Sequence, residues 1–131
     1  MIFVDSSVWI DLFNQRTNPQ TARLTVELQK RLPKIAVGDL VAYEVLRGIG
    51  NDKRRAKTWQ YLKKHQLVQL VGFERARRAA ERYAELRTVG RTVRKTNDVL
   101  IASYCLDEGL PLLFSDKDFV HFVEHFGMRK A

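Results

Sequence analysis

The stretch MIFVDSSVWIDLF (residues 1–13) contains the pattern from which the fold follows. Ile2 to Val4 form a short apolar run, typical of a buried strand, and Asp5 follows it directly. The same order returns near the other end of the chain, where Leu112 to Phe114 lead into Asp116. In open parallel α/β sheets, ligands and catalytic groups collect beyond the carboxyl ends of the strands. Both acids are therefore expected at one edge of a parallel sheet.

Strand and helix patterns alternate along the 131 residues, which fit one ordinary domain (1–131). Further short strands are expected at 35–37 and 67–71, and helices include 21–32 and 73–88. Strands separated by helices imply right-handed crossovers and a parallel sheet covered on both faces. The residues predicted to cap helices are Ser6 or Ser7, Asp39, Asp52 and Asp118.

Composition and charge limit the function classes. Lys and Arg number 23 against 15 Asp and Glu, a net charge of +8 that favours RNA or DNA as partner, then an anionic membrane surface. A merely soluble basic domain is the simpler alternative. The single cysteine, Cys105, excludes an internal disulfide framework and is predicted to lie in the core. Neither a signal peptide nor an apolar run of about 20 residues is present, so we expect a cytoplasmic protein without membrane segments.

Two more acids, Glu44 and Asp98, interrupt apolar helical patterns, where a solvated carboxylate is not expected. Each acid alone has a structural explanation: Asp98 could complement the positive end of its helix, and Glu44 could pair with Arg47. Burial of several uncompensated charges is costly, however, so the four acids together point to a shared role. Hard divalent cations take carboxylate ligands and support phosphodiester hydrolysis. Together with the positive net charge, this predicts a metal-dependent enzyme acting on nucleic acid.

Three segments carry a resemblance to a known family: DSSVWIDLF (5–13), YEVLRG (43–48) and NDVLIASYCLDEGLPLLFSDKDF (97–119). In this order, over essentially the whole chain, they resemble the PIN-domain signature. Within that family the chain is most similar to the VapC-type ribonuclease toxins of type II toxin–antitoxin systems. The resemblance implies a PIN-like three-layer α/β/α fold with a short parallel sheet of four or five strands.

The resemblance also implies an activity, a cofactor and partners. The activity is an endoribonuclease that cleaves tRNA or ribosomal RNA and inhibits translation, with Mg²⁺ or Mn²⁺ and a metal-activated water. The partners are a cognate VapB-like antitoxin, whose tail blocks the active site, and a second copy in a homodimer. The catalytic and metal-binding acids carried over are Asp5, Glu44, Asp98 and Asp116. Candidates for an outer shell around the metal are Ser6, Ser115 and Asp118.

Basic residues are concentrated in 73–95, where eight of them face three acids. Part of this charge is expected on a solvated helix face with pairs such as Arg77–Glu81. The better candidates for contact with RNA phosphates lie between Gly90 and Asp98. They are Arg91, Arg94 and Lys95. A second basic patch at 53–57 could meet RNA, the antitoxin or only water.

Other interpretations have weaker support. The segment HFVEH (121–125) matches an inverted zinc-protease pattern, but only six residues follow it, so no third ligand stands downstream. A haloacid-dehalogenase-like phosphatase requires an acid where Ser7 stands, and a receiver domain pairs acids near the first strand. A non-catalytic RNA-binding or adaptor module is the remaining alternative, although it has no need for four acids. The aromatic residues predicted to be core or interface rather than base-stacking are Trp9, Trp59, Tyr61 and Phe73.

Overall fold

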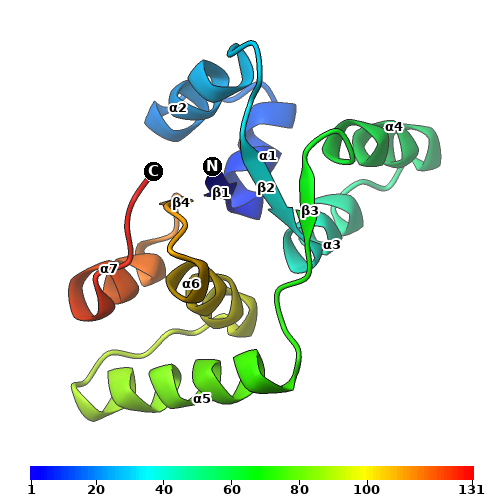
Figure 1. Cartoon of the computed structure of the whole chain (residues 1–131). Helices are drawn as coiled ribbons and strands as arrows, with labels where there is room; N and C mark the ends of the chain where they lie inside the picture. Colours follow the sequence, from blue (N-terminus) through cyan, green and yellow to red (C-terminus); the bar gives the residue numbers. More distant parts are fainter.

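A four-stranded parallel sheet lies at the centre of the computed structural model, which describes residues 1–131 (Figure 1). The strand order is β3-β2-β1-β4, and every neighbouring pair is parallel. The strands are β1 (Ile2–Val4), β2 (Ile35–Gly38), β3 (Gln66–Val68) and β4 (Leu112–Leu113). The predicted α/β class and parallel sheet are confirmed.

Two groups of helices cover the sheet. Helices α1 to α4 form the connections from β1 to β2 to β3, whereas α5 and α6 carry the chain back to β4 on the other side. Because parallel crossovers are right-handed, the reversal of direction places the two groups on opposite faces. The helices are α1 (Ser6–Phe13), α2 (Pro19–Leu28), α3 (Asp39–Arg47), α4 (Asp52–Leu62), α5 (Phe73–Thr88), α6 (Thr96–Glu108), the short 3₁₀ helix η1 (Lys117–Phe119) and α7 (Val120–Phe126).

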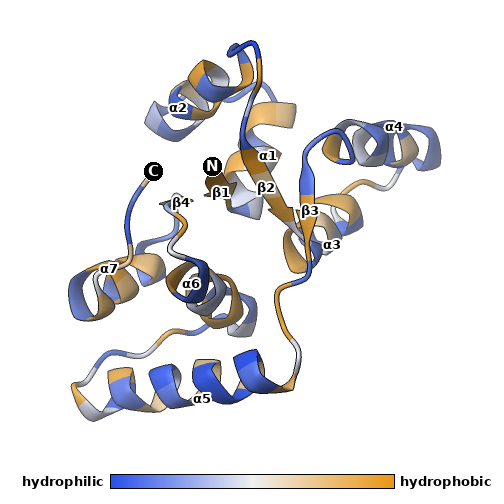
Figure 2. Cartoon of the chain, viewed as in Figure 1, coloured by the Kyte–Doolittle hydropathy of each residue, from blue (hydrophilic) through white to orange (hydrophobic).

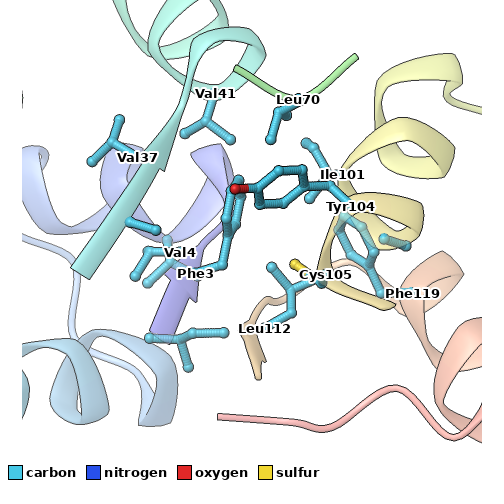
Figure 3. Packing of buried hydrophobic residues seen from close by; sticks show 14 of the residues in the cluster. Phe3, Val4, Val37, Val41, Leu70, Ile101, Tyr104, Cys105, Leu112 and Phe119 are labelled. Carbon is cyan, nitrogen blue, oxygen red and sulfur yellow. The ribbon is translucent and has the colours of Figure 1, made fainter. Parts of the chain in front are cut away.

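The core is built on both faces of the sheet, where the apolar strands and helix faces meet (Figures 2 and 3). Phe3 of β1 packs against Tyr104 of α6, with ring centroids 5.8 Å apart. Gly38 permits close packing beside them, since a Cβ there would lie 2.8 Å from Phe3 Cζ and 2.9 Å from a Leu70 methyl group. Cys105 is buried in this core as predicted. None of the helices combines the length and hydropathy that crossing a membrane requires.

The chain terminus covers the outer edge of β4. The Leu112 N–H donates to the Arg129 carbonyl, and the Ala131 N–H donates to the Leu112 carbonyl, both at 2.9 Å. Leu112 and Lys130 thus form an isolated parallel bridge. The resemblance implied four or five strands, and this isolated bridge is the nearest equivalent to a fifth strand.

Several predicted capping residues are wrong by one position or more. Asp5, not Ser6 or Ser7, caps α1, because its carboxylate accepts from the Ser7 N–H. Gly38 and Asn51 precede α3 and α4. Asp39 and Asp52 are instead the first helical residues, and Asp116 rather than Asp118 caps η1. A carboxylate caps only where its own backbone is extended and its oxygen can reach an N–H of the first turn, which composition alone does not fix.

Helix α2 is shorter than expected. It starts at Pro19 and ends at Leu28, whereas the leucine spacing predicted a helix from residue 21 to 32. Glu27 explains the early end, because its carboxylate accepts from the Lys34 N–H at 3.2 Å and lies 2.6 Å from Lys30 Nζ. These contacts turn the chain back toward β2 and leave Leu32 exposed.

Candidate active site

The predicted acids converge on the crevice at the carboxyl ends of β1 and β4. From β1 the chain moves one way to β2, and it later returns to β4 on the other side, so this crevice is the switch point of the sheet. The Asp5 N–H donates to the Leu113 carbonyl at 3.0 Å, which ties the two strand ends together. Asp98 lies in the first turn of α6, and Glu44 lies in the middle of α3.

Asp5 is held by its neighbour Ser7. One carboxylate oxygen, Oδ2, accepts from the Ser7 hydroxyl at 2.6 Å and from the Ser7 N–H at 3.3 Å. The other oxygen, Oδ1, is buried and has no partner. Burial raises the pKa of Asp5, and the hydrogen bonds from Ser7 offset only part of that effect. Ser7 was missed as a site residue, although a hydroxyl two positions after a capping Asp is a recognisable signal.

Asp98 and Glu44 also carry buried oxygens without partners, Oδ2 and Oε1 respectively. Burial, and then the charges of Asp5 and Asp116, raise the pKa of Asp98 to about 7. Burial, and then Asp5, raise the pKa of Glu44, while the nearby Ser6 hydroxyl lowers it. The predicted pair of Glu44 with Arg47 does not form, since the Arg47 guanidinium lies over the Tyr43 ring at 5.4 Å, although its charge still lowers the pKa of Glu44. Negative charge in the crevice is therefore incompletely compensated.

Asp116 and Asp118 complete the acidic group. Asp116 Oδ1 accepts from the Asp118 N–H at 2.9 Å, and Oδ2 accepts from Lys95 Nζ at 3.0 Å. The Asp118 backbone N–H and Lys95 together hold the pKa of Asp116 below its usual range despite partial burial. The Asp118 carboxylate accepts from the Arg94 N–H at 3.2 Å. One oxygen each from Asp98, Asp116 and Asp118 lie within 4.8 Å of one another.

This donor set fits a divalent cation. Buried carboxylate oxygens are normally paired, so Asp5 Oδ1, Glu44 Oε1 and Asp98 Oδ2 are unusual in having no partner. The side chains of these acids offer only carboxylate oxygens as metal ligands, and hard cations such as Mg²⁺ and Mn²⁺ prefer oxygen ligands. Of the other candidates, Ser6 is buried beside Glu44, whereas Ser115 is exposed.

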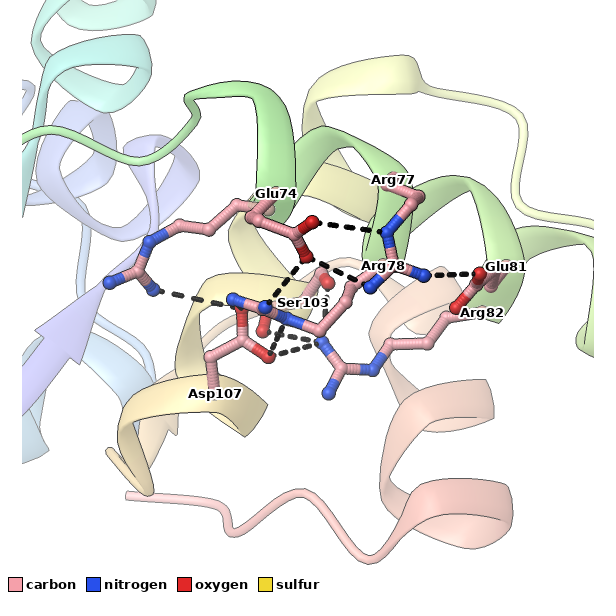
Figure 4. A network of polar contacts seen from close by, with 8 residues as sticks. Glu74, Arg77, Arg78, Glu81, Arg82, Ser103 and Asp107 are labelled. Carbon is pink, nitrogen blue, oxygen red and sulfur yellow. Dashed lines mark hydrogen bonds and ion pairs between the residues drawn. The ribbon is translucent and has the colours of Figure 1, made fainter.

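Most of the basic charge of α5 is used inside the structure. Arg78 and Arg82 point toward Asp107 of α6 (Figure 4). Arg77 lies between two acids of its own helix, 2.8 Å from Glu74 and 2.6 Å from Glu81, which confirms the predicted Arg77–Glu81 pair. The basic residues of α5 are therefore mainly engaged in ion pairs, with α6 or within α5, rather than free for RNA.

The candidate RNA-binding residues differ in their surroundings. Arg91 turns toward α7, where its guanidinium contacts Glu124 and His121, each at 3.3 Å. Arg94 is exposed, and its guanidinium makes no ion pair, whereas Lys95 is paired with Asp116. The H-x-x-E-H segment makes its contacts away from the four acids of the candidate site, since His125 lies beside Glu85 of α5.

The four aromatic residues fall into three environments. Trp9 is fully buried and stacks on Phe13 with ring centroids 5.8 Å apart, as predicted for a core residue. Trp59 and Tyr61 are partly buried against the core. Phe73 is 99% exposed, so its prediction as a core residue is wrong, and its place at an interface stays a prediction. It stands at the first position of α5, where the ring has no facing element.

Comparison with known proteins identifies relatives in sequence and in fold. A sequence model of the PIN domain matches residues 2–124 of the chain. Ribonuclease VapC11 of Mycobacterium tuberculosis is 27% identical over 119 residues, which cover 91% of this chain and 89% of the relative.

Solved structures share the fold at lower identity. The crystal structure of VapBC2 from Rickettsia felis, bound to a DNA fragment from their promoter, has a chain with a TM-score of 0.75 and 19% identity, covering 100% of this chain and 98% of that one. FitAcB from Neisseria gonorrhoeae has a TM-score of 0.72 at 16% identity, with 92% of both chains covered. A toxin–antitoxin complex from Klebsiella pneumoniae has a TM-score of 0.69 at 21% identity, covering 91% of this chain and 90% of that one.

Proposed function

The chain belongs to the PIN-domain family, and we propose that it is a divalent-metal-dependent endoribonuclease, the toxin of a toxin–antitoxin pair. The observation that carries the proposal is the set of three buried, unpartnered carboxylate oxygens on Asp5, Glu44 and Asp98. A similar protein, matched over 91% of this chain, is a ribonuclease, and similar folds occur in toxin–antitoxin complexes. We further propose that residues 1–131 form one PIN-like domain and that this domain carries the activity.

The acids of the crevice would hold Mg²⁺ or Mn²⁺. The ligands are Asp5, Glu44, Asp98 and Asp116, with Asp118, Ser6 and Ser115 as outer-shell candidates. When bound, the cation neutralises charge on the phosphate and lowers the pKa of water. The Ser7 hydroxyl donates to Asp5 Oδ2 and so fixes the orientation of the carboxylate. The other oxygen, Oδ1, remains without a hydrogen bond. The Asp118 N–H orients Asp116 by donating to Oδ1, while the other oxygen, Oδ2, accepts from Lys95.

The substrate proposed is an RNA of translation, tRNA or ribosomal RNA, bound in the cytoplasm. The net charge of +8 favours a polyanion, and Arg94, whose backbone N–H donates to Asp118, has an exposed side chain that would contact a backbone phosphate. Arg91 and Lys95 are further candidates for such contacts. The proposed partners are a VapB-like antitoxin and a second copy of the chain in a homodimer.

Cleavage of total cellular RNA by purified protein tests the activity. Wild type is expected to give discrete fragments with Mg²⁺ or Mn²⁺ and none with EDTA, and Asp5→Asn is expected to be inactive with either metal. Asp52→Asn is the matched control, since Asp52 is an exposed acid on α4. Full cleavage by a folded Asp5→Asn protein would contradict the proposal. Salt-sensitive RNA binding by wild type without any cleavage would favour the non-catalytic adaptor instead.

A further inference from the structure

One cationic side chain, Lys95, reaches into the carboxylate crevice. Its Nζ lies 3.0 Å from Asp116 Oδ2. The hydrogen bond and charge of Asp116 raise the pKa of Lys95, and Asp98 and Asp5 add smaller attractions. In return the ammonium lowers the pKa of Asp98 and of Glu44. Lys95 thus forms a direct ion pair with one of the acids expected to bind the metal.

The position of Lys95 allows its ammonium group to leave Asp116 for another anion. The residue directly precedes α6, and its side chain makes no capping hydrogen bond to that helix. The side chain is 68% exposed, and Asp116 is its one ion-pair partner. A long ammonium side chain paired at an exposed site contributes little stability and can change partners at small cost. Asp5 and Asp98, by contrast, are fixed by burial.

We propose that Lys95 is a tethered counter-cation of the metal site: it binds Asp116 while the metal is absent and transfers to an RNA phosphate when the metal takes that carboxylate. The inference rests on the proposed function, because it assumes that Asp116 binds the metal. The two cations would compete for the same carboxylate, so the lysine would lower the affinity for the metal in the free protein. A backbone phosphate offers the displaced ammonium a new anion.

A coupling between metal and RNA follows from this exchange. RNA that binds Lys95 removes a competitor of the metal, and the metal releases a lysine for RNA, so each ligand strengthens the other by the same factor. The free protein would therefore bind metal weakly and assemble its complete site on the substrate. Lys95 would act as a positioning residue for both ligands.

Metal affinity without RNA tests the competition. Titration calorimetry with Mn²⁺ is made on wild type, Lys95→Met and Lys95→Arg. Lys95→Met is expected to bind Mn²⁺ about fivefold tighter than wild type, equivalent to about 1 kcal/mol, and Lys95→Arg is expected to behave like wild type. The matched control is Lys34→Met, which removes the same charge at the opposite, amino-terminal end of β2 and should leave the affinity unchanged.

The outcomes separate the inference from the proposed function. Unchanged or weaker Mn²⁺ binding by folded Lys95→Met overturns the competition, because a lysine that merely holds Asp116 in place would weaken binding when removed. Absence of Mn²⁺ binding by wild type at millimolar concentrations would overturn the metal site itself.

A second titration tests the transfer to phosphate. Mn²⁺ binding is measured with and without a 2′-O-methyl phosphorothioate oligonucleotide, which serves as a cleavage-resistant polyanion. The oligonucleotide is expected to tighten Mn²⁺ binding more in wild type than in Lys95→Met. Equal tightening in both proteins would show that the phosphate acts without the lysine and would overturn the transfer.

Discussion

Arg78 donates two hydrogen bonds to Asp107, from Nε to Oδ1 and from Nη2 to Oδ2, each at 3.1 Å, and so joins α5 to α6 (Figure 4). Arg82 Nη1 lies 2.8 Å from the same carboxylate and also donates to the Ser103 carbonyl at 2.9 Å. The Asp107 side chain is only 9% exposed. This network supports the helix whose first turn carries Asp98.

Asp107→Asn is expected to lower the free energy of unfolding by about 2 kcal/mol, because it removes the charge that compensates the half-buried guanidinium groups of Arg78 and Arg82. Urea denaturation at pH 7.5 in EDTA measures it. Glu81→Gln is the control, with an expected loss below about 0.5 kcal/mol, since its pair with Arg77 is exposed. Equal losses in the two variants would mean that the network contributes no more than a surface pair.

The stability that Asp107 contributes should depend on pH. Burial alone would raise the pKa of Asp107, but hydrogen bonds and charges from Arg78 and Arg82 lower it further than burial raises it. A lowered folded-state pKa means that the unfolded chain binds the proton more readily. The contribution is therefore present above the ordinary pKa of an aspartate and is lost as pH falls below it. The gap in stability between wild type and Asp107→Asn should narrow when urea denaturation is repeated at pH 3.

Asp98 has the opposite dependence on pH. Its pKa is raised from 3.8 to about 7, so the folded protein keeps a proton that the unfolded chain releases as pH rises through this window. The free energy of unfolding of the metal-free protein should therefore decrease as pH rises from about 3.8 to about 7. Above that range Asp98 should cause no further change. Asp98→Asn cannot ionise, so it is expected to melt at a higher temperature than wild type at pH 8 in EDTA. The difference should vanish at pH 4, and a difference of the same size at both pH values would contradict the assignment.

Metal binding should stabilise the fold through the same acids. At a free Mn²⁺ concentration of about 100 times the dissociation constant, wild type should gain about 2.7 kcal/mol. Asp5→Asn is expected to lose most of this gain, because it removes a negative charge and alters the carboxylate that Ser7 orients. Thermal denaturation with and without Mn²⁺ measures the effect, and Asp52→Asn should respond like wild type. An undiminished gain in Asp5→Asn would place the ion elsewhere.

Phosphate contact by Arg94 should appear in the salt dependence of RNA binding. Arg94→Ala is expected to weaken binding and to reduce the slope of log affinity against log salt by about one. Fluorescence anisotropy in EDTA, over a series of KCl concentrations, keeps the RNA intact. Arg77→Ala is the control, because Glu74 and Glu81 already pair with that guanidinium. An unchanged slope for Arg94→Ala would exclude the contact.

Local sequence was sufficient for the elements that depend on nearby residues. The bounds of β1 and α5 agree with the predicted ones, because an apolar triplet ends at Asp5 and a helical period runs from Phe73 until the chain reaches Gly90. The end of α2 was missed, because its last turn is replaced by contacts between Glu27 and residues up to Lys34. Phe73 was misjudged because the apolar period shows that a helix has a face but not what covers it.

The sequence by itself determined the alternation of strands and helices, the parallel sheet and the acids after β1 and β4, since these follow from short-range patterns and from the chirality of crossovers. Only the tertiary structure decided which groups meet those acids. Lys95 reaches Asp116 across 21 positions, Arg94 reaches Asp118 across 24, and Arg78 reaches Asp107 across 29. Such pairings depend on how α5, α6 and the segment after β4 pack together. The packing is fixed by the whole buried core, and no local pattern in the sequence encodes it.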